Sequence, residues 1–174
     1  GDGVELDECV PGLPTQLLDQ ATEVGTTSGA SQLAGSCGGG NAPEAAWLYP
    51  VERVLRELTF TTAGSAIDTL LYLYRDTCGT GELACQDTFP NETIRLHDPP
   101  PGDYYAIVDS FQAQGSYTLG VSGVIAGGEG CDPAETNFVC EVGYLCDGTT
   151  CAPTACNDGG DDDGDGDIDY PADP

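Results

Sequence analysis

The chain has 174 residues, with four arginines, no lysine and 30 acidic residues, which gives a formal net charge of −26. Nucleic acid and anionic membranes bind proteins through Lys and Arg, so this charge argues against both as partners. So many carboxylates repel one another unless cations screen or bridge them, and divalent cations are natural ligands for them. The length accommodates one domain of ordinary size and a small appendage.

Nine cysteines, no methionine and one histidine indicate an extracellular protein with disulfides. A cytosolic metal-binding or redox protein is the alternative, but no C-x-x-C spacing and no pair of histidines supports it. No apolar run approaches the length of a membrane span. No signal peptide is visible, so a secreted form of this sequence would be mature or trimmed.

Residues 1–36 are expected to form an N-terminal arm. Within it, Thr15 to Val24 is predicted to be a strand or a short helix. Cys9 is expected to pair with Cys37 and so to tie the arm to the domain. Residues 1–14 could be a partly ordered tail; the alternative is that the arm pairs along an exposed sheet edge of a neighbouring subunit.

Residues 37–123 show an all-β pattern. Short strands are expected at Glu44–Tyr49, Leu55–Thr62, Ile67–Arg75, Thr93–Leu96, Tyr104–Asp109 and Tyr117–Ser122. RVLREL alone would suit a helix, but the period-2 run LTFTT outweighs it, and Pro50 should end or bend its strand. Short strands with turn-rich segments between them predict a β-sandwich or barrel.

Two further details follow from this pattern. Tyr105/Ile107 and Tyr117/Leu119/Val121 are predicted to face inward, because two stacked sheets need alternating apolar faces. The most β-prone run, Leu70 to Tyr74, leads into a turn where Cys78 and Cys85 are expected to clip a hairpin tip.

The segments CGGGNAPEAAWLY, SAIDTLLYLY, GDYYAIVD and GSYTLGVS follow one another in an order that resembles the bacterial pre-peptidase C-terminal domain family. They are most similar to its cysteine-clipped versions in secreted multidomain proteins of myxobacteria and relatives. The resemblance covers about residues 37–123 and implies a jelly-roll-like β-sandwich that is accessory to other activities rather than catalytic. Some relatives bind calcium, and some collagenase-associated ones bind collagen.

Residues 124–155 are expected to be a Gly-led hinge followed by a disulfide-rich spacer. This segment is too short for a hydrophobic core, so disulfides must hold it. Three pairings of its four cysteines are open, and the favoured one joins Cys131 to Cys146 and Cys140 to Cys151. The spacer would be a small knot of the epidermal-growth-factor-like or a similar kind.

Residues 156–174, CNDGGDDDGDGDIDYPADP, carry an alternating series of aspartates that resembles an EF-hand-type calcium loop with glycine at its sixth position. The twelfth position is Ala172 rather than Glu, so the segment is more similar to the calcium repeats of dockerins and thrombospondin type 3 segments. The predicted Ca²⁺ ligands are Asp161, Asp163, Asp165, Asp167, Asp169 and Asp173. Calcium would stiffen this linker, whereas a disordered acidic tail is the alternative.

Cys156 is the cysteine left without a partner. The similar myxobacterial segments usually have a cysteine after the DP, and this sequence does not. The partner of Cys156 is therefore expected beyond the end of this chain or on another chain. Either identical subunits stack head to tail into a filament, or the chain is one module of a longer secreted protein.

Other candidate residues have plainer interpretations. His97, the single histidine, is expected in a loop, because no nucleophile motif such as G-x-S-x-G supports a catalytic triad. Asn91 begins an N-glycosylation triplet, a pattern that also occurs by chance. Asp68 and Asp109 could hold a second calcium or cap turns. Six tyrosines could form a sugar-binding face, although core packing explains most of them: Tyr49, Tyr72, Tyr74, Tyr104, Tyr105 and Tyr117.

Taken together, the sequence predicts a non-enzymatic extracellular structural or adhesive subunit. It would self-associate head to tail into a cell-surface fibre with calcium-stiffened linkers. The alternative function is an accessory module of a secreted multidomain hydrolase that binds carbohydrate or collagen. Neither nucleic-acid binding nor membrane insertion is expected.

Overall fold

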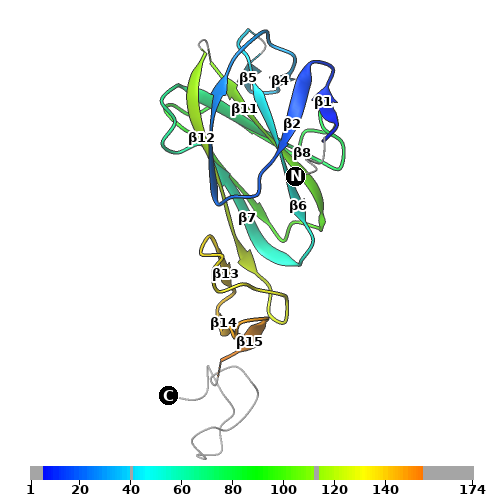
Figure 1. The fold of residues 1–174 in the computed structure, drawn as a ribbon, viewed down its shortest axis with the longest axis vertical. Coiled ribbons are helices and arrows are strands. Elements are labelled where there is room, and N and C mark those ends of the chain that lie inside the picture. Colours follow the sequence, from blue (N-terminus) through cyan, green and yellow to red (C-terminus); the bar gives the residue numbers. More distant parts are fainter. Residues whose placement is uncertain (1–5, 40, 112–113, 155–174) are drawn as a thin grey trace, which may run out of the picture.

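A computed structural model of the chain describes residues 6–39, 41–111 and 114–154. These residues form fifteen β-strands and no helix, which confirms the predicted all-β class. Two packed sheets make a sandwich, and a small appendage continues from one end of it along the longest axis of the molecule (Figure 1). Nothing in the described residues forms a helix long and apolar enough to cross a membrane.

The six-stranded sheet has the order β1-β2-β6-β11-β8-β9. Its strands are β1 (Glu8–Val10), β2 (Leu13–Leu17), β6 (Ala45–Val51), β8 (Thr69–Arg75), β9 (Ala84–Gln86) and β11 (Gly102–Ser110). The five-stranded sheet has the order β10-β7-β12-β13, with β3 also paired to β12. Its strands are β3 (Thr22–Thr27), β7 (Leu55–Thr61), β10 (Thr93–His97), β12 (Gly115–Ile125) and β13 (Phe138–Cys140). Two ribbons remain: β4 (Ala34–Gly35) with β5 (Gly38–Gly39), and β14 (Tyr144–Cys146) with β15 (Cys151–Pro153).

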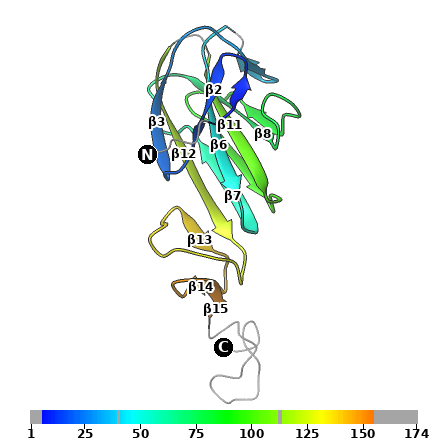
Figure 2. The same cartoon turned by 45° about the vertical axis from the view of Figure 1, so that its right-hand side comes forward.

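The main core lies between the two sheets, which Figure 2 shows from a second direction. As predicted, β12 points its alternating apolar residues Tyr117, Leu119 and Val121 into this core. Trp47 of β6 donates its indole N–H to the Tyr117 hydroxyl at 2.8 Å, so one buried hydrogen bond joins the two sheets. A buried donor needs such a partner, because leaving it unpaired costs about 1–3 kcal/mol.

The outer face of the six-stranded sheet is buried as well. It carries a second apolar cluster, made of Leu13, Ala46, Tyr72, Tyr74 and Ile107. Val10 and Leu33 from the N-terminal segment pack against this cluster. The sheet is therefore covered on both faces, by the second sheet on one side and by the N-terminal segment on the other.

This double burial corrects one prediction. Tyr105 and Ile107 were expected to face the space between the sheets, but they belong to the outer cluster. The other set of β11 residues takes the inner side: Tyr104, Ala106 and Val108. A strand covered on both faces buries both alternating sets, so a period of two does not tell which set meets the second sheet.

Two disulfides attach the covering segment to the sheet, Cys9–Cys78 and Cys37–Cys85, with Cα–Cα distances of 5.0 and 5.6 Å. The expected Cys9–Cys37 bond and the expected Cys78–Cys85 clip are therefore wrong. Cys78 and Cys85 both pack against the outer cluster, where the N-terminal segment also lies, so each meets a cysteine of that segment. Bonds that close such long loops stabilise a domain by restricting its unfolded chain.

The N-terminal segment also adds strands to both sheets. β2 pairs in parallel with β6, and β3 pairs antiparallel with β12, so the arm pairs within its own chain. The expected single element from Thr15 to Val24 is wrong, because β2 ends and β3 begins inside that range. Pro50 does not end its strand but lies within β6. The Leu48 carbonyl accepts from the Leu18 N–H at 2.8 Å, so the backbone of Pro50, two residues on, also faces the β2 side rather than β11. The pairing of β2 with β6 ends at Leu48, so the missing N–H of Pro50 has no ladder partner to lose.

We expect Tyr117→Phe to destabilise the sandwich by about 1–3 kcal/mol, because the Trp47 indole N–H would lose its buried acceptor. Urea unfolding followed by the fluorescence of this single tryptophan measures the change. Tyr105→Phe is the matched control, since Tyr105 is only half-buried on the outer face. Equal stability of the two variants would contradict the role given to this hydrogen bond.

Candidate functional site

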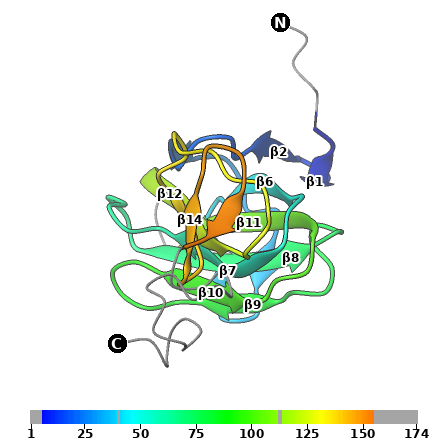
Figure 3. The same cartoon turned by 90° about the horizontal axis from the view of Figure 1, so that it is seen from below.

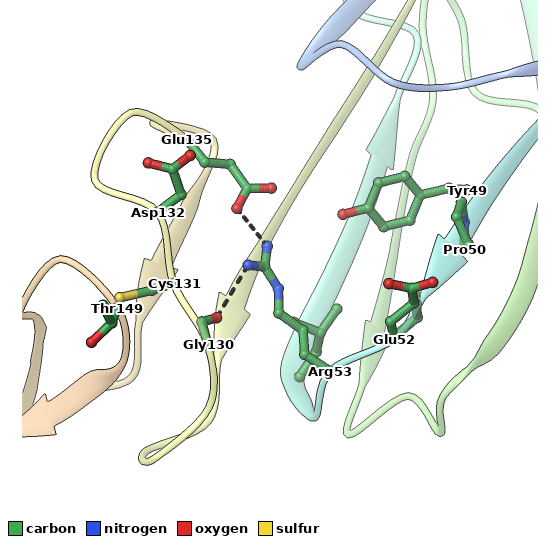
Figure 4. A pocket seen from close by; sticks show the side chains of 11 residues that line it. Tyr49, Pro50, Glu52, Arg53, Gly130, Cys131, Asp132, Glu135 and Thr149 are labelled. Carbon is green, nitrogen blue, oxygen red and sulfur yellow. Dashed lines mark hydrogen bonds and ion pairs between the residues drawn. The ribbon is translucent and has the colours of Figure 1, made fainter.

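The appendage is clamped to the lower end of the sandwich by Arg53, which lies in the turn between β6 and β7 (Figure 4). The Arg53 guanidinium donates to Glu135 Oε2 at 2.8 Å and to the carbonyl oxygen of Gly130 at 3.3 Å. The Cζ atom of Arg53 lies 4.8 Å from the centre of the Phe138 ring, which makes a cation–π contact. Phe138 in turn stacks on Tyr49 of β6, with ring centres 5.8 Å apart. Arg53 therefore contacts the appendage through an ion pair, a hydrogen bond to a backbone carbonyl and a cation–π contact.

A second arginine repeats the pattern nearby. Arg56 Nε donates to Glu141 Oε2 at 2.9 Å, and the backbone N–H of Gly127 donates to Glu141 Oε1 at 2.6 Å. These two contacts, the Gly127 N–H first, lower the pKa of Glu141. The backbone continues the connection, since β13 pairs in parallel with the end of β12 and Ala126 N donates to Val54 O. The segment expected to act as a Gly-led hinge is thus fastened to the sandwich.

Inside the appendage, the disulfides are Cys131–Cys146 and Cys140–Cys151, the pairing that the sequence favoured. Cys151 is fully buried and joins the main core cluster, and Cys131 and Cys140 pack against it. The appendage therefore does not form a core of its own but shares the core of the sandwich. This explains why so short a segment can hold a defined shape with two disulfides.

A cavity of about 500 Å³ opens between the two parts, beside the Arg53 clamp (Figure 4). Glu52, Tyr49 and Pro50 line it from the sandwich, and Gly130, Asp132 and Thr149 line it from the appendage. Burial raises the pKa of Tyr49 to about 12, so its hydroxyl stays protonated at neutral pH and can donate a hydrogen bond. The wall of the cavity therefore carries neutral hydroxyl groups, carboxylates and a backbone carbonyl, all available to a ligand inside it.

These polar groups are spread out rather than gathered on one point. Among the described residues, one set of three ligand-type side chains has all its donor atoms within 4.8 Å of one another. This set is Cys131, Cys140 and Cys151, and these cysteines form disulfides. A divalent cation needs several oxygens at 2.0–2.6 Å. The cavity is thus better suited to a ligand that carries several separate hydroxyl groups than to a single ion.

The opposite end of the sandwich holds buried carboxylates. Asp109, at the end of β11, is fully buried, and it accepts hydrogen bonds from the Ser110 N–H at 2.6 Å and from the Tyr72 hydroxyl at 3.2 Å. Burial, and to a smaller extent the neighbouring carboxylate of Glu44, raise the pKa of Asp109 to about 6. Gly39 lies so close to Asp109 that any Cβ at this position would collide with the carboxylate. Its φ of 85° also favours glycine.

Glu44 and Glu92 are two further carboxylates buried at this end. Glu44 accepts from the N–H groups of Gln32 and Leu33 at 2.6 and 2.7 Å, while its Oε2 is buried without a hydrogen-bond partner. Glu92 is buried among threonine hydroxyls and accepts from Thr62 at 2.8 Å. Burial raises the pKa of both groups.

Asp68 precedes β8 and Asp109 lies near the end of the neighbouring strand β11, where the Phe111 N–H donates to the Asp68 carbonyl oxygen at 3.1 Å. Asp109 interacts electrostatically with Glu44, and Asp68 with Glu92. Among the described residues, the one set of three clustered ligand-type side chains includes neither residue, so the second calcium stays a prediction. The sequence did not single out Glu44 or Arg53, because their role depends on partners far away in the chain.

The other predicted residues have simpler environments. His97 was expected in a loop, which is wrong: it is the exposed last residue of β10, with Nδ1 3.9 Å from Glu57. The Asn91 amide nitrogen, in its favourable orientation, lies 3.1 Å from the carbonyl oxygens of Pro90 and Thr62, so a glycan there would require the side chain to turn outward. Four of the six tyrosines are buried, which supports the core-packing interpretation: Tyr72, Tyr74, Tyr104 and Tyr117.

The predicted calcium ligands and Cys156 lie outside the described residues, so both stay predictions. The eight other cysteines all form disulfides, as expected for a secreted protein.

Comparison with known proteins finds a likeness among solved structures. No protein-family profile matches the chain, and no curated protein matches it. The crystal structure of the pre-peptidase C-terminal domain of a collagenase from Bacillus anthracis is similar, with a TM-score of 0.42 and 17% sequence identity over 62% of this chain and 92% of that one. The sequence resembles the same family; the myxobacterial cysteine-rich variant and the calcium loop stay predictions.

We expect the buried Asp109 to make stability depend on pH. Because its folded pKa of about 6 lies above the usual 3.8, its contribution is fully present below pH 3.8 and is lost as the pH rises through 6. A difference of about two pK units corresponds to about 3 kcal/mol. Urea midpoints measured between pH 4 and 7 should fall with rising pH, and should fall less in Asp109→Asn. The exposed Asp103→Asn is the control, and an identical slope in both variants would contradict the assignment.

We also expect the intact chain to bind Ca²⁺ through its acidic segment. Titration calorimetry should give a binding isotherm that weakens at least about tenfold in Asp163→Asn/Asp165→Asn, because each removed carboxylate costs a charged ligand. Asp103→Asn should bind as the unchanged chain does. The prediction fails if the intact chain releases no heat with millimolar Ca²⁺.

Proposed function

We propose that this chain is a non-catalytic accessory module of a secreted multidomain protein and that its junction cavity binds a carbohydrate. The proposal rests on one observation: the sandwich and the appendage build a single cavity between them and are clamped together around it by Arg53. Ligand sites are commonly found where two parts of a protein meet.

The chemistry of the cavity favours sugar hydroxyls. Glu52 and Asp132 can accept hydrogen bonds from two neighbouring hydroxyls, and the Tyr49 and Thr149 hydroxyls can donate as well as accept. Its volume of about 500 Å³ falls within the range of about 300–1,000 Å³ usual for small-molecule sites. The strongly negative chain disfavours an acidic polysaccharide, so a neutral sugar is the expected ligand.

The clamp would also assist binding. A site that is rigid before the ligand arrives loses less entropy on binding than a site that must close first. Two ion pairs, a cation–π contact and a β-ladder hold the appendage in place without any ligand.

Glycan-array screening of the intact chain, followed by calorimetry on the best neutral oligosaccharide, tests this proposal. Glu52→Ala and Asp132→Asn should each weaken binding at least about tenfold, because each removes a charged hydrogen-bond acceptor. Asp87→Asn removes the same charge at an exposed position beside Gly38, at the opposite end of the sandwich, and should leave the affinity unchanged. Binding to a collagen-like peptide with no glycan binding, or glycan binding that neither variant alters, would refute the proposal.

The head-to-tail fibre expected from the sequence stays a prediction. It depends on the acidic segment and on Cys156, both outside the described residues. If it forms, removing calcium with a chelator should loosen the particles seen in electron micrographs. A chain that stays monomeric at every calcium concentration would exclude it.

A further inference from the structure

A second pocket, of about 270 Å³, lies at the edge of the sandwich where β8 and β9 meet β10. Figure 3, viewed from below, shows β9 and β10 next to each other on the side away from β2. The end of β8 contributes Arg75, β10 contributes Arg95 and His97, and the floor is apolar, with Leu83, Leu96 and Pro100.

The pocket concentrates the rare basic side chains of this chain. Its sequence holds four arginines and one histidine against 30 acidic residues. Two of the arginines, Arg53 and Arg56, hold the appendage. The other two and the histidine all line this one pocket. An uneven distribution of such scarce side chains indicates a site for a negatively charged group.

The guanidinium groups are oriented by neighbouring carboxylates. Arg75 Nε donates to Asp76 at 3.1 Å, and Arg95 Nε lies 3.1 Å from Glu57 Oε1. Each of these ion pairs uses Nε, whereas a carboxylate ligand can be taken by the amino groups at the other end of a guanidinium. Asp76 and Glu57 also limit how much negative charge the pocket can accept, and the chain as a whole repels polyanions. The ligand that fits carries a single carboxylate.

The apolar floor defines the rest of the ligand. Leu83 is about half exposed, at 47%, which leaves apolar surface available to a ligand. The ring of Tyr104, which also lines the pocket, is buried at 1% exposure and so offers no face for a sugar ring. Its hydroxyl donates to the Pro100 carbonyl at 2.7 Å and so supports the floor. A small apolar side chain beside one carboxylate matches both the volume and the polarity of the pocket.

We propose that this pocket binds the free C-terminal carboxylate of a partner peptide whose last residue is apolar, with the carboxylate held by Arg75 and Arg95 and the side chain on the Leu83–Leu96–Pro100 floor. The site is separate from the junction cavity. It would give the module a protein contact in addition to any carbohydrate ligand, and the two can be tested independently.

The test uses the intact chain and the tetrapeptide acetyl-Gly-Pro-Ala-Leu, once with a free C-terminal carboxylate and once as its amide. We expect the acid to bind with a dissociation constant in the range of about 10–1,000 μM, and the amide to bind at least about tenfold more weakly, because it cannot form the charge-assisted bonds. Arg75→Gln and Arg95→Gln should each weaken binding of the acid about tenfold. Circular dichroism checks that both variants are folded.

Arg53→Gln is the charge-matched control, since it removes one arginine at the other cavity and should leave peptide binding unchanged. Arg75→Lys keeps the charge but loses the planar fork, so it should lie between the unchanged chain and Arg75→Gln. Equal affinity for acid and amide would overturn the proposal. So would an equal loss in Arg53→Gln, binding of trigalacturonate in place of the peptide, or no binding of the acid at millimolar concentration.

Discussion

The contact between Arg53, Glu135 and the Phe138 ring joins the two parts of this protein into one body. It acts together with the Arg56–Glu141 ion pair and the pairing of β13 with β12 to hold residues 126–154 against the sandwich. Exposed ion pairs contribute little to stability, but this pair is partly buried, with side-chain exposures of 23% and 30%, and it lies on a ring that belongs to the main core. The orientation of the appendage and the cavity beside it both depend on this contact.

The six-stranded sheet imposes a second constraint, since its outer face carries a buried apolar cluster as well. An uncovered face with Tyr72, Tyr74 and Ile107 would favour aggregation. The N-terminal segment covers it, and two disulfides hold that cover in place. The cysteines of the first 85 residues therefore serve to close the outer layer of the sandwich. They do not clip local turns, which is why each bond spans at least 48 residues.

Charge is unevenly distributed between the two ends of the sandwich. The four arginines lie toward the end that carries the appendage, at the junction and at the second pocket. The other end buries Glu44, Glu92 and Asp109, whose hydrogen-bond donors are backbone N–H groups and hydroxyls. Burial without a paired cation raises the pKa of each of these carboxyls. The acidic end thus gains protons at a higher pH than an exposed surface would.

The sequence alone determined the all-β class and most strands of the sandwich, and it favoured, among three open pairings, the one found within the appendage. These features depend on local periodicity or on cysteines that lie close together in a segment with no core. Only the tertiary structure decided which face of β11 meets the second sheet, because a strand buried on both faces has apolar residues in both alternating sets. It also decided which cysteines pair with Cys78 and Cys85, because their partners lie far away in the sequence. The role of Arg53 and the gathering of Arg75, Arg95 and His97 were likewise invisible in the sequence. The packing of the sheets brings these side chains next to residues that are tens of positions away in the sequence, and no local sequence pattern predicts such contacts.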